Sequence, residues 1–433
     1  CTRLPLAPLW IGAIAVGMES IRSNFPLNGF PWGRLAFTQP SGALLPLASV
    51  GGAPLITFAV VLIGVGLAQC AHRLRTPHAL VAPAAAVLVP IVAGLALMPT
   101  INSAPPVGSR TVGLVQGGGP NIGVRLLDEP NVLWRTHLAE ARVLAARIAA
   151  GKVAKPDMVF FPESTVDLPG ATPRDAEAVG FLARLLGVPV AVGTRELPSN
   201  GPAQNVVVAW RPGPGPLGGT ELGSYAKQEL VPYAEYVPLK SVAKLFTPFL
   251  DQASNMKPGD QPGVITIAGA KVGFAICYEV AYDRISRQAV DAGAQLLVVP
   301  TNNAWFGRTE MTYQQLAMAR VRAVEHDRAV VVAASTGVSA VVRPDGSVES
   351  PTSLFAPATV VASVPLKGDH TVADKLGPST ERAFDLVGLL GVVLGFGARR
   401  SMRRRAAVPG LASSGAPGSS TAVTPEPEGE HDR

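Results

Sequence analysis

The sequence predicts an α/β domain held between membrane-spanning helices. From residue 111 onward, short apolar runs of strand-forming residues alternate with segments of helical periodicity, which is the pattern of α/β domains. Long stretches without charge flank this region, and only 16% of the 433 residues are charged. Soluble domains usually contain about 25% charged residues. We therefore expect part of the chain to face lipid.

The N-terminal hundred residues are expected to contain the membrane helices. Two uncharged runs, residues 44–70 and 79–98, can each cross the hydrocarbon layer, which takes about 20 residues. A first apolar run, residues 4–18, is marginal in length. The chain opens on Cys1, which we interpret as the start of a fragment, with processing at a lipobox as the alternative. Residues 1–100 thus predict transmembrane helices of an α-helical bundle that lacks earlier spans.

A shorter apolar run lies near the C-terminus. Residues 386–398 carry no charge and begin beside Asp385, so they fit either a last membrane span or an interfacial helix. We predict a final transmembrane helix at residues 383–402. The chain then becomes rich in Gly, Ser, Pro, Thr and Glu, which predicts a disordered cytoplasmic tail over residues 403–433.

Basic residues orient these helices. Residues 72–75 and 399–405 are rich in arginine and follow the second and the last apolar run, so both flanks should be cytoplasmic. Residues 100–380 are then expected outside. Arg22 and Arg34, in a loop assigned to the outer side, oppose this orientation. The arginine cluster also accounts for much of the net charge of +6, so no nucleic-acid partner is needed to explain it.

The region between the apolar ends contains a series of predicted strands. They are mostly continuous apolar runs, as expected for sheets covered on one face by helices. These runs are residues 111–115, 158–161, 188–192, 206–210, 272–276, 296–299 and 329–333. Residues 131–150 and 310–327 have helical spacing, and Asp345-Gly346 between two short apolar runs predicts a hairpin turn.

Cys277 is the candidate nucleophile. Cys1, Cys70 and Cys277 lie in separate regions, so the sequence contains no disulfide framework and no Cys/His cluster of metal-binding spacing. An oxidising compartment tends to consume idle cysteines, which makes a single thiol in an exported domain unusual. Cys277 directly follows the apolar run 272–276, a position suited to nucleophilic attack.

A thiol with an ordinary pKa near 8.5 needs a base and a cation to act as a nucleophile. Glu163 and Lys227 each follow an apolar stretch, at strand ends where α/β folds gather catalytic groups. Judged by spacing alone, each is better interpreted as a surface charge than as a catalytic group. His326 ends a helical pattern among charged neighbours, which favours a solvated role over a Cys/His pair.

Three sequence blocks, in order, carry a resemblance. They are FPES at residues 161–164, YAKQELVPYAEYVP at 225–238 and ICYE at 276–279, and they resemble the Glu-Lys-Cys blocks of the nitrilase or carbon-nitrogen hydrolase superfamily. The end of the lysine block, together with NNAWFG at 302–307 and GFPW at 29–32, narrows the resemblance to the apolipoprotein N-acyltransferase family.

The resemblance covers about residues 5–400 and implies an architecture. In that family a nitrilase-like α-β-β-α sandwich lies outside the cytoplasmic membrane and is inserted between transmembrane helices. We accordingly expect an extracytoplasmic catalytic domain at residues 105–375. The implied location is the bacterial cytoplasmic (inner) membrane, with several membrane passes.

The resemblance also implies roles for the three central residues and their neighbours. Glu163 corresponds to the general base, Lys227 to the group that stabilises the oxyanion, and Cys277 to the nucleophile. Glu235 and Glu279 match the supporting carboxylates, which we expect to orient the lysine.

Further residues are expected around this triad. The backbone N–H of Tyr278 is a candidate oxyanion donor because it follows the nucleophile. Trp32, Trp305 and Phe306 are the candidate substrate- and lipid-binding residues. Trp305 and Phe306 also fit ordinary core aromatics.

The implied reaction transfers an acyl chain from a membrane phospholipid, through a thioester on Cys277, to a lipoprotein. The acceptor is the α-amine of its N-terminal diacylglyceryl-cysteine. No cofactor, no metal and no nucleic acid is expected. One alternative is a membrane-tethered amidase or nitrilase that uses the same triad on a small amide, and another is a catalytically idle membrane scaffold.

Overall fold

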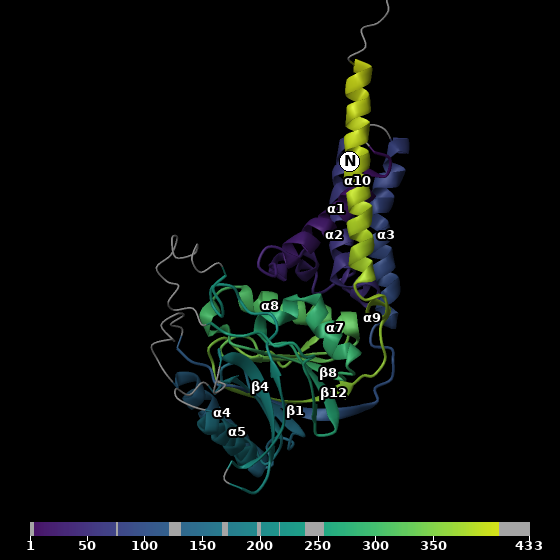
Figure 1. The fold of residues 1–433 in the computed structure, drawn as a ribbon. Coiled ribbons are helices and arrows are strands. Elements are labelled where there is room, and N and C mark those ends of the chain that lie inside the picture. Colours follow the sequence, from purple (N-terminus) through teal and green to yellow (C-terminus); the bar gives the residue numbers. More distant parts are fainter. Residues whose placement is uncertain are drawn as a thin grey trace, which may run out of the picture.

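A helical bundle is joined to a layered α/β domain (Figure 1). The computed structural model describes residues 4–74, 77–120, 131–166, 172–196, 201–215, 217–238 and 255–406. Cys1, Arg75 and the tail beyond residue 406 lie outside the described residues, so the predictions made for them stay predictions.

The bundle consists of α1 (Ala7–Asn24), α2 (Ala48–His72), α3 (Val81–Leu97) and α10 (Ser379–Ala406). α1 packs against both α2 and α10, and α2 packs against α3. Figure 1 shows α10 running away from the α/β domain alongside α1, so segments from the two ends of the chain lie side by side.

Two segments of this bundle are long and apolar enough to cross a membrane among the residues that the structure describes. They are Leu45–His72 and Val81–Thr100, which match the two predicted spans. α1 and α10 do not reach the same criterion of length and composition. Of the predicted transmembrane bundle, the described residues therefore support two membrane-spanning helices.

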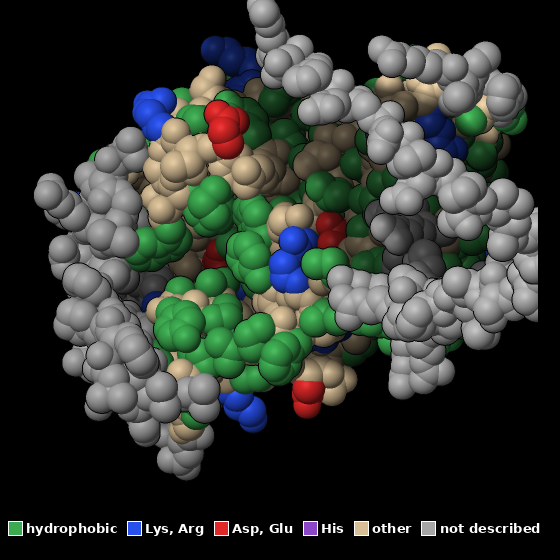
Figure 2. All heavy atoms as spheres, turned by 90° about the horizontal axis from the view of Figure 1, so that it is seen from above, with side chains coloured by type: hydrophobic (Ala, Val, Ile, Leu, Met, Phe, Trp, Pro, Cys, Tyr) green, Lys and Arg blue, Asp and Glu red, His purple; other side chains and the backbone are tan. Residues whose placement is uncertain are grey.

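The outer surface of the bundle is apolar. Large hydrophobic side chains of α3 and α10 are exposed, among them Leu88, Val89, Leu389 and Phe396. In the view from above, hydrophobic side chains cover much of the described surface and charged ones are scattered among them (Figure 2). Such a surface fits contact with lipid.

α2 is kinked near its start, where it meets the α/β domain. Gly51 and Gly52 depart from helical φ/ψ, and Gly52 has a φ of +63°. A Cβ atom at Gly52 would lie 2.6 Å from the Glu325 Oε1 atom. Only glycine fits both the backbone conformation and this close approach.

The α/β domain has four layers, α-β-β-α, as predicted. The first sheet has the order β12-β1-β2-β3-β4-β5 and the second has the order β11-β10-β9-β8-β7-β6. α4 (Val132–Ala149) and α5 (Thr172–Leu186) cover the outer face of the first sheet, and α7 (Asp283–Asp291) and α8 (Met311–His326) cover the second on the side of the bundle (Figure 1).

The strands have the following bounds. The first sheet contains β1 (Gly108–Gln116), β2 (Met158–Phe160), β3 (Val190–Glu196), β4 (Gln204–Pro212), β5 (Gly219–Ala226) and β12 (Ala358–Leu366). The second contains β6 (Val264–Ile267), β7 (Ala270–Phe274), β8 (Leu296–Thr301), β9 (Val330–Ala334), β10 (Ala340–Val342) and β11 (Val348–Glu349). β1–β2–β3 and β7–β8–β9 are parallel neighbours.

Every predicted strand overlaps an observed one, and both predicted helices and the hairpin at Asp345-Gly346 are present. β5, β6 and β12 were not predicted. β5 interrupts its apolar residues with glycines and polar residues, so it lacks the apolar run of a covered strand. Glu163 and Cys277 follow the carboxyl ends of the parallel strands β2 and β7.

Apolar packing continues from the α/β domain into the bundle. One core cluster contains Val299 and Val330 of the second sheet, Met318 of α8, and Ile56 and Ala59 of α2, all nearly inaccessible to solvent. Helix α8 is thus covered by α2, a helix of the bundle, rather than by water.

Candidate active site

Cys277 begins a short 3₁₀ turn, η8 (Cys277–Ala281), three residues after β7 ends. Its side chain is buried, and its φ is +54°. A positive φ is uncommon outside glycine, costs free energy, and persists where surrounding contacts hold it, often at active sites. The backbone at Cys277 is therefore strained in the way expected for a functional residue.

Lys227 lies directly after β5 and is 1% exposed. Its Nζ atom is 3.2 Å from Glu163 Oε1 and 3.0 Å from the Glu235 carboxylate. Burial alone would lower the pKa of Lys227, but the charges of Glu163 and Glu235 outweigh it and raise that pKa well above its ordinary value. The lysine is therefore a fixed ammonium group.

Glu163 follows β2 and is almost completely buried. Its Oε1 atom accepts a hydrogen bond from Asn205 Nδ2 (2.7 Å), and its Oε2 atom accepts one from the Asn302 backbone N–H (2.8 Å). Burial raises the pKa of Glu163, but Lys227 and these donors more than offset it, so the pKa lies below its usual value. Glu163 is a carboxylate, the form required of a base.

The thiol of Cys277 is protonated at rest. Burial, followed by the negative charge of Glu163, raises its pKa to about 12, while the charge of Lys227 acts in the opposite direction. The structure thus brings Glu163, Lys227 and Cys277 within electrostatic reach of one another. Transfer of its proton to a base would make this thiol a nucleophile, and Glu163 is an ionised carboxylate whose charge acts on the thiol pKa.

Glu235 contacts Lys227 directly, as expected from the resemblance. Its Oε2 atom also accepts a hydrogen bond from the Val231 backbone N–H (2.8 Å), and its Oε1 atom accepts one from Asn205 Nδ2 (2.8 Å). Asn205 therefore bridges Glu163 and Glu235, a role that the sequence analysis missed. The only signal was a polar residue just before the apolar run 206–210.

Glu279 acts on the site through the backbone rather than by touching the ammonium group. One of its oxygens accepts the N–H groups of Gln228 (2.6 Å) and Glu229 (3.1 Å), and the other accepts that of Ile276 (2.7 Å). Burial raises the pKa of Glu279 to about 8, while these bonds and the charge of Lys227 oppose that rise. Glu279 thus joins the residues after Lys227 to the residue before Cys277.

The predicted lipid-binding residues separate into two groups. Trp32 stacks on Tyr278, with ring centroids 6.2 Å apart, and meets Phe306 edge to face at 5.9 Å. Trp305 is instead 41% exposed. The Tyr278 hydroxyl donates to the Gly29 carbonyl (3.3 Å), so the 29–32 segment of the bundle contacts the residue after Cys277.

Comparisons with known proteins identify the families that the chain matches. The carbon-nitrogen hydrolase family matches residues 111–368, and the apolipoprotein N-acyltransferase N-terminal domain matches residues 1–66. An apolipoprotein N-acyltransferase of Mycolicibacterium smegmatis is 38% identical, over 94% of this chain and 72% of that protein. One of Azotobacter vinelandii is 32% identical, over 93% of this chain and 74% of that protein.

Solved structures also resemble the α/β domain. An amidase from Nesterenkonia sp. is 20% identical with a TM-score of 0.41, over 61% of this chain and 94% of that one. Nit3 of Saccharomyces cerevisiae, a nitrilase superfamily member, is 17% identical with a TM-score of 0.43, over 65% of this chain and 95% of that one.

Proposed function

The chain belongs to the apolipoprotein N-acyltransferase family within the carbon-nitrogen hydrolases, and from this premise we propose that Cys277, Glu163 and Lys227 catalyse its reaction. The protein is an acyltransferase that N-acylates lipoproteins. The names of the relatives do not favour the alternative of an amidase that acts on a small amide.

The first half-reaction uses a membrane phospholipid as acyl donor. Glu163 takes the thiol proton as the Cys277 sulfur attacks the ester carbonyl carbon, and the Lys227 ammonium and the Tyr278 N–H stabilise the oxyanion. The tetrahedral intermediate collapses with cleavage of the ester C–O bond, and the leaving alkoxide takes the proton from Glu163. Lysophospholipid departs, and a thioester remains on Cys277.

The second half-reaction consumes the thioester. The free α-amine of the acceptor's N-terminal diacylglyceryl-cysteine attacks the thioester carbonyl while Glu163 accepts a proton from the amine. The C–S bond breaks, the thiolate regains a proton from Glu163, and an amide is released. Donor and acceptor therefore react in turn, in a ping-pong order.

One observation carries this mechanism above all. The Glu163 carboxylate and the Lys227 ammonium group lie 3.2 Å apart in a buried site, and both charges act on the pKa of the buried Cys277 thiol. The carboxylate supplies the base that the thiol lacks, and the ammonium supplies positive charge where the oxyanion develops. Supporting roles follow from the contacts of Glu235 with Lys227 and of Glu279 with both loops.

The family places the protein in the bacterial inner membrane. We further propose several membrane passes and an extracytoplasmic catalytic domain at residues 105–375, with a final membrane helix at 383–402. α10 runs away from the α/β domain along the bundle (Figure 1), so its C-terminal end lies on the side away from that domain. Trp32, Trp305 and Phe306 are proposed to contact the lipid substrates.

A reporter lipoprotein tests this function. Its N-terminal peptide, analysed by mass spectrometry, should gain an N-linked acyl chain with the wild-type protein and not with Cys277→Ala. With Cys277→Ser, no thioester should be trapped from labelled phospholipid. Undiminished acylation of the reporter by Cys277→Ala would rule out the mechanism, and ammonia release from soluble amides without lipid would support the amidase instead.

A further inference from the structure

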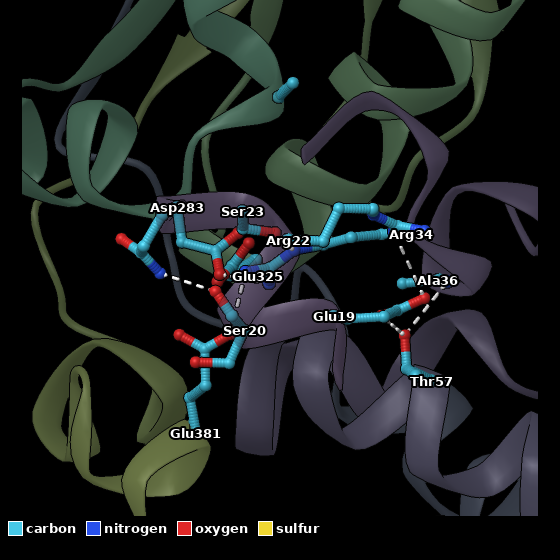
Figure 3. Close-up of polar contacts among 12 residues, drawn as sticks. Glu19, Ser20, Arg22, Ser23, Arg34, Ala36, Thr57, Asp283, Glu325 and Glu381 are labelled. Atoms are coloured by element: carbon cyan, nitrogen blue, oxygen red, sulfur yellow. Dashed lines mark hydrogen bonds and ion pairs between the residues drawn. The ribbon is translucent and has the colours of Figure 1, made fainter. Parts of the chain in front are cut away.

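Arg34 is a buried cation where the bundle meets the α/β domain. It follows η1 (Pro31–Gly33) in the connection between α1 and α2 and is 4% exposed. Its guanidinium donates to Asp283 Oδ2 (2.6 Å), to Glu381 Oε1 (2.7 Å) and to Ser23 Oγ (3.1 Å). Figure 3 shows these partners arriving from three separate parts of the chain.

Asp283 connects Arg34 to Arg322, which contacts the turn that carries Cys277. It is the first residue of α7, and its second oxygen accepts a hydrogen bond from Arg322 Nη2 (2.5 Å) of α8. Arg322 is fully buried and also donates to the carbonyl groups of Val280 (3.0 Å) and Ala281 (2.9 Å). These two carbonyls belong to η8, the turn that begins with Cys277.

The bundle also contacts Arg322 by a second route. Phe37, in η2 (Leu35–Thr38) of the same α1–α2 connection, lies under the Arg322 guanidinium at 5.5 Å. Arg322 is further paired with Glu325, whose other oxygen lies against the Gly52 backbone in the kink of α2. The cation that binds η8 is therefore enclosed by groups from the bundle.

Arg34 and Asp283 are both charged at neutral pH. Burial would raise the pKa of Asp283, but Arg34 and Arg322 outweigh it and hold the pKa well below its usual range. Burial likewise opposes the charged form of Arg34, yet Asp283 and Glu381 raise its pKa. Removing Arg34 leaves Glu381 and one oxygen of Asp283 without this cation, so the remaining groups must rearrange.

We propose that Arg34 is a positioning residue for acyl transfer, acting through Asp283 and Arg322 on the turn that carries Cys277. The inference rests on the proposed role of Cys277 as nucleophile. The positive φ of Cys277 requires contacts that hold the turn in place, and Arg322 supplies two of them. Arg34 links this support to Glu381 at the start of α10 and so to the membrane helices.

The test compares Arg34→Ala, Arg34→Lys and the control Arg22→Ala in the full chain purified in detergent. Arg22 lies in the last turn of α1, next to Ser23, which contacts Arg34. Its side chain is 44% exposed, and its ion pair with Glu19 is loose, at 3.7 Å. Each protein is mixed with a phospholipid bearing a fluorescent acyl chain in mixed micelles. The label on Cys277 is followed in a single turnover, which gives an amplitude and a rate constant.

Positioning and folding have different signatures in this experiment. We expect Arg34→Ala to keep the wild-type amplitude and to lower the rate constant about 10- to 100-fold, as for small displacements of a reacting group. Arg34→Lys should lie between, and Arg22→Ala should match the wild type. A reduced amplitude with an unchanged rate constant would mean a purely structural role and would overturn the proposal, as would an unchanged rate and amplitude.

Asp283→Asn provides a second route to the same answer, including the case in which Arg34→Ala does not fold. This near-isosteric change should lower the rate constant similarly, and the Asp283→Asn/Arg34→Lys double variant should be little slower than Asp283→Asn alone. Full additivity would show that the two residues act independently and would contradict the chain of contacts. These outcomes are separate from the proposed function, which Cys277→Ala tests.

Discussion

Asn205 holds Glu163 and Glu235 together through a single amide nitrogen, at 2.7 Å and 2.8 Å. Lys227 approaches both carboxylates from its own strand end. The buried site therefore contains two acids and one ammonium group, with an amide donor between the acids.

Glu163→Gln should lose both half-reactions. The amide cannot accept the thiol proton, and the raised pKa of Cys277 leaves almost no thiolate at neutral pH. We expect thioester formation to slow by about 10²- to 10⁴-fold, the usual contribution of general base catalysis. Single-turnover labelling of Cys277 measures this, and Glu196→Gln, at the exposed end of β3, is the matched control. Thioester formation at the normal rate would exclude Glu163 as the first base.

Lys227→Met should abolish acyl-enzyme formation while the thiol remains present. The substitution removes the charge that faces the oxyanion and leaves Glu163 and Glu235 without their cation. Loss of one partner from a buried ion pair costs about 3–5 kcal/mol of stability. Thermal unfolding should show the loss of stability, and thiol titration of the denatured protein should still count Cys277. A variant that forms thioester normally would contradict the assigned role.

Asn205→Leu should shift the pH dependence of the first half-reaction. Although burial raises the pKa of Glu163, Lys227 and then the Asn205 hydrogen bond lower it. Loss of that bond raises the pKa. Because the base is lost as the pH falls through this pKa, the acid limb of the rate profile should move to higher pH. Stopped-flow labelling across the acidic range measures the limb, and an unmoved limb would show that Asn205 does not tune Glu163.

Glu279→Gln should destabilise the site more than its small change in shape suggests. Backbone N–H groups of Gln228, Glu229 and Ile276 donate hydrogen bonds to the carboxylate. The NH₂ group of glutamine is itself a donor, so it cannot accept these hydrogen bonds. Each unsatisfied buried group costs about 1–3 kcal/mol. Denaturant unfolding above the Glu279 pKa of about 8, where this side chain is ionised, should show a lower midpoint with an unchanged m-value. A midpoint equal to that of the wild type would mean that the bonds contribute little.

Trp32 and Trp305 should differ in kinetic effect. Trp32 packs against Tyr278, so Trp32→Ala should lower the rate constant of acyl transfer. Trp305 is 41% exposed, and if it contacts lipid, Trp305→Ala should raise the KM for phospholipid with little change in kcat. Steady-state kinetics in micelles of varied donor content separates the two. Identical changes in both parameters for both variants would count against this division.

Much of the fold followed from local patterns. Continuous apolar runs predicted the covered strands. Glu163 and Cys277, which lie three residues after β2 and β7, both act on the pKa of the buried Lys227. β5 was not predicted because its sequence contains no continuous apolar run. The sequence could not reveal that Asn205 bridges two carboxylates, since Glu163 and Glu235 lie 42 and 30 residues away along the chain.

The charge pattern of the N-terminal region was harder to interpret. Arg34 appeared to oppose the predicted orientation because the positive-inside rule counts basic residues without their partners. The structure pairs it with Asp283, 249 residues away, and with Glu381, 347 residues away. An arginine neutralised by two partly buried carboxylates carries little of the charge on which that rule depends.

The core cluster that runs from Val299 and Val330 through Met318 to Ile56 has a practical consequence. If residues 105–375 were produced alone, the surface of α8 that now touches α2 would face water, and the fragment would self-associate or require detergent even without the helices of the bundle. Biochemists who seek a soluble version of this enzyme should therefore redesign that surface of α8 as well as removing the spans.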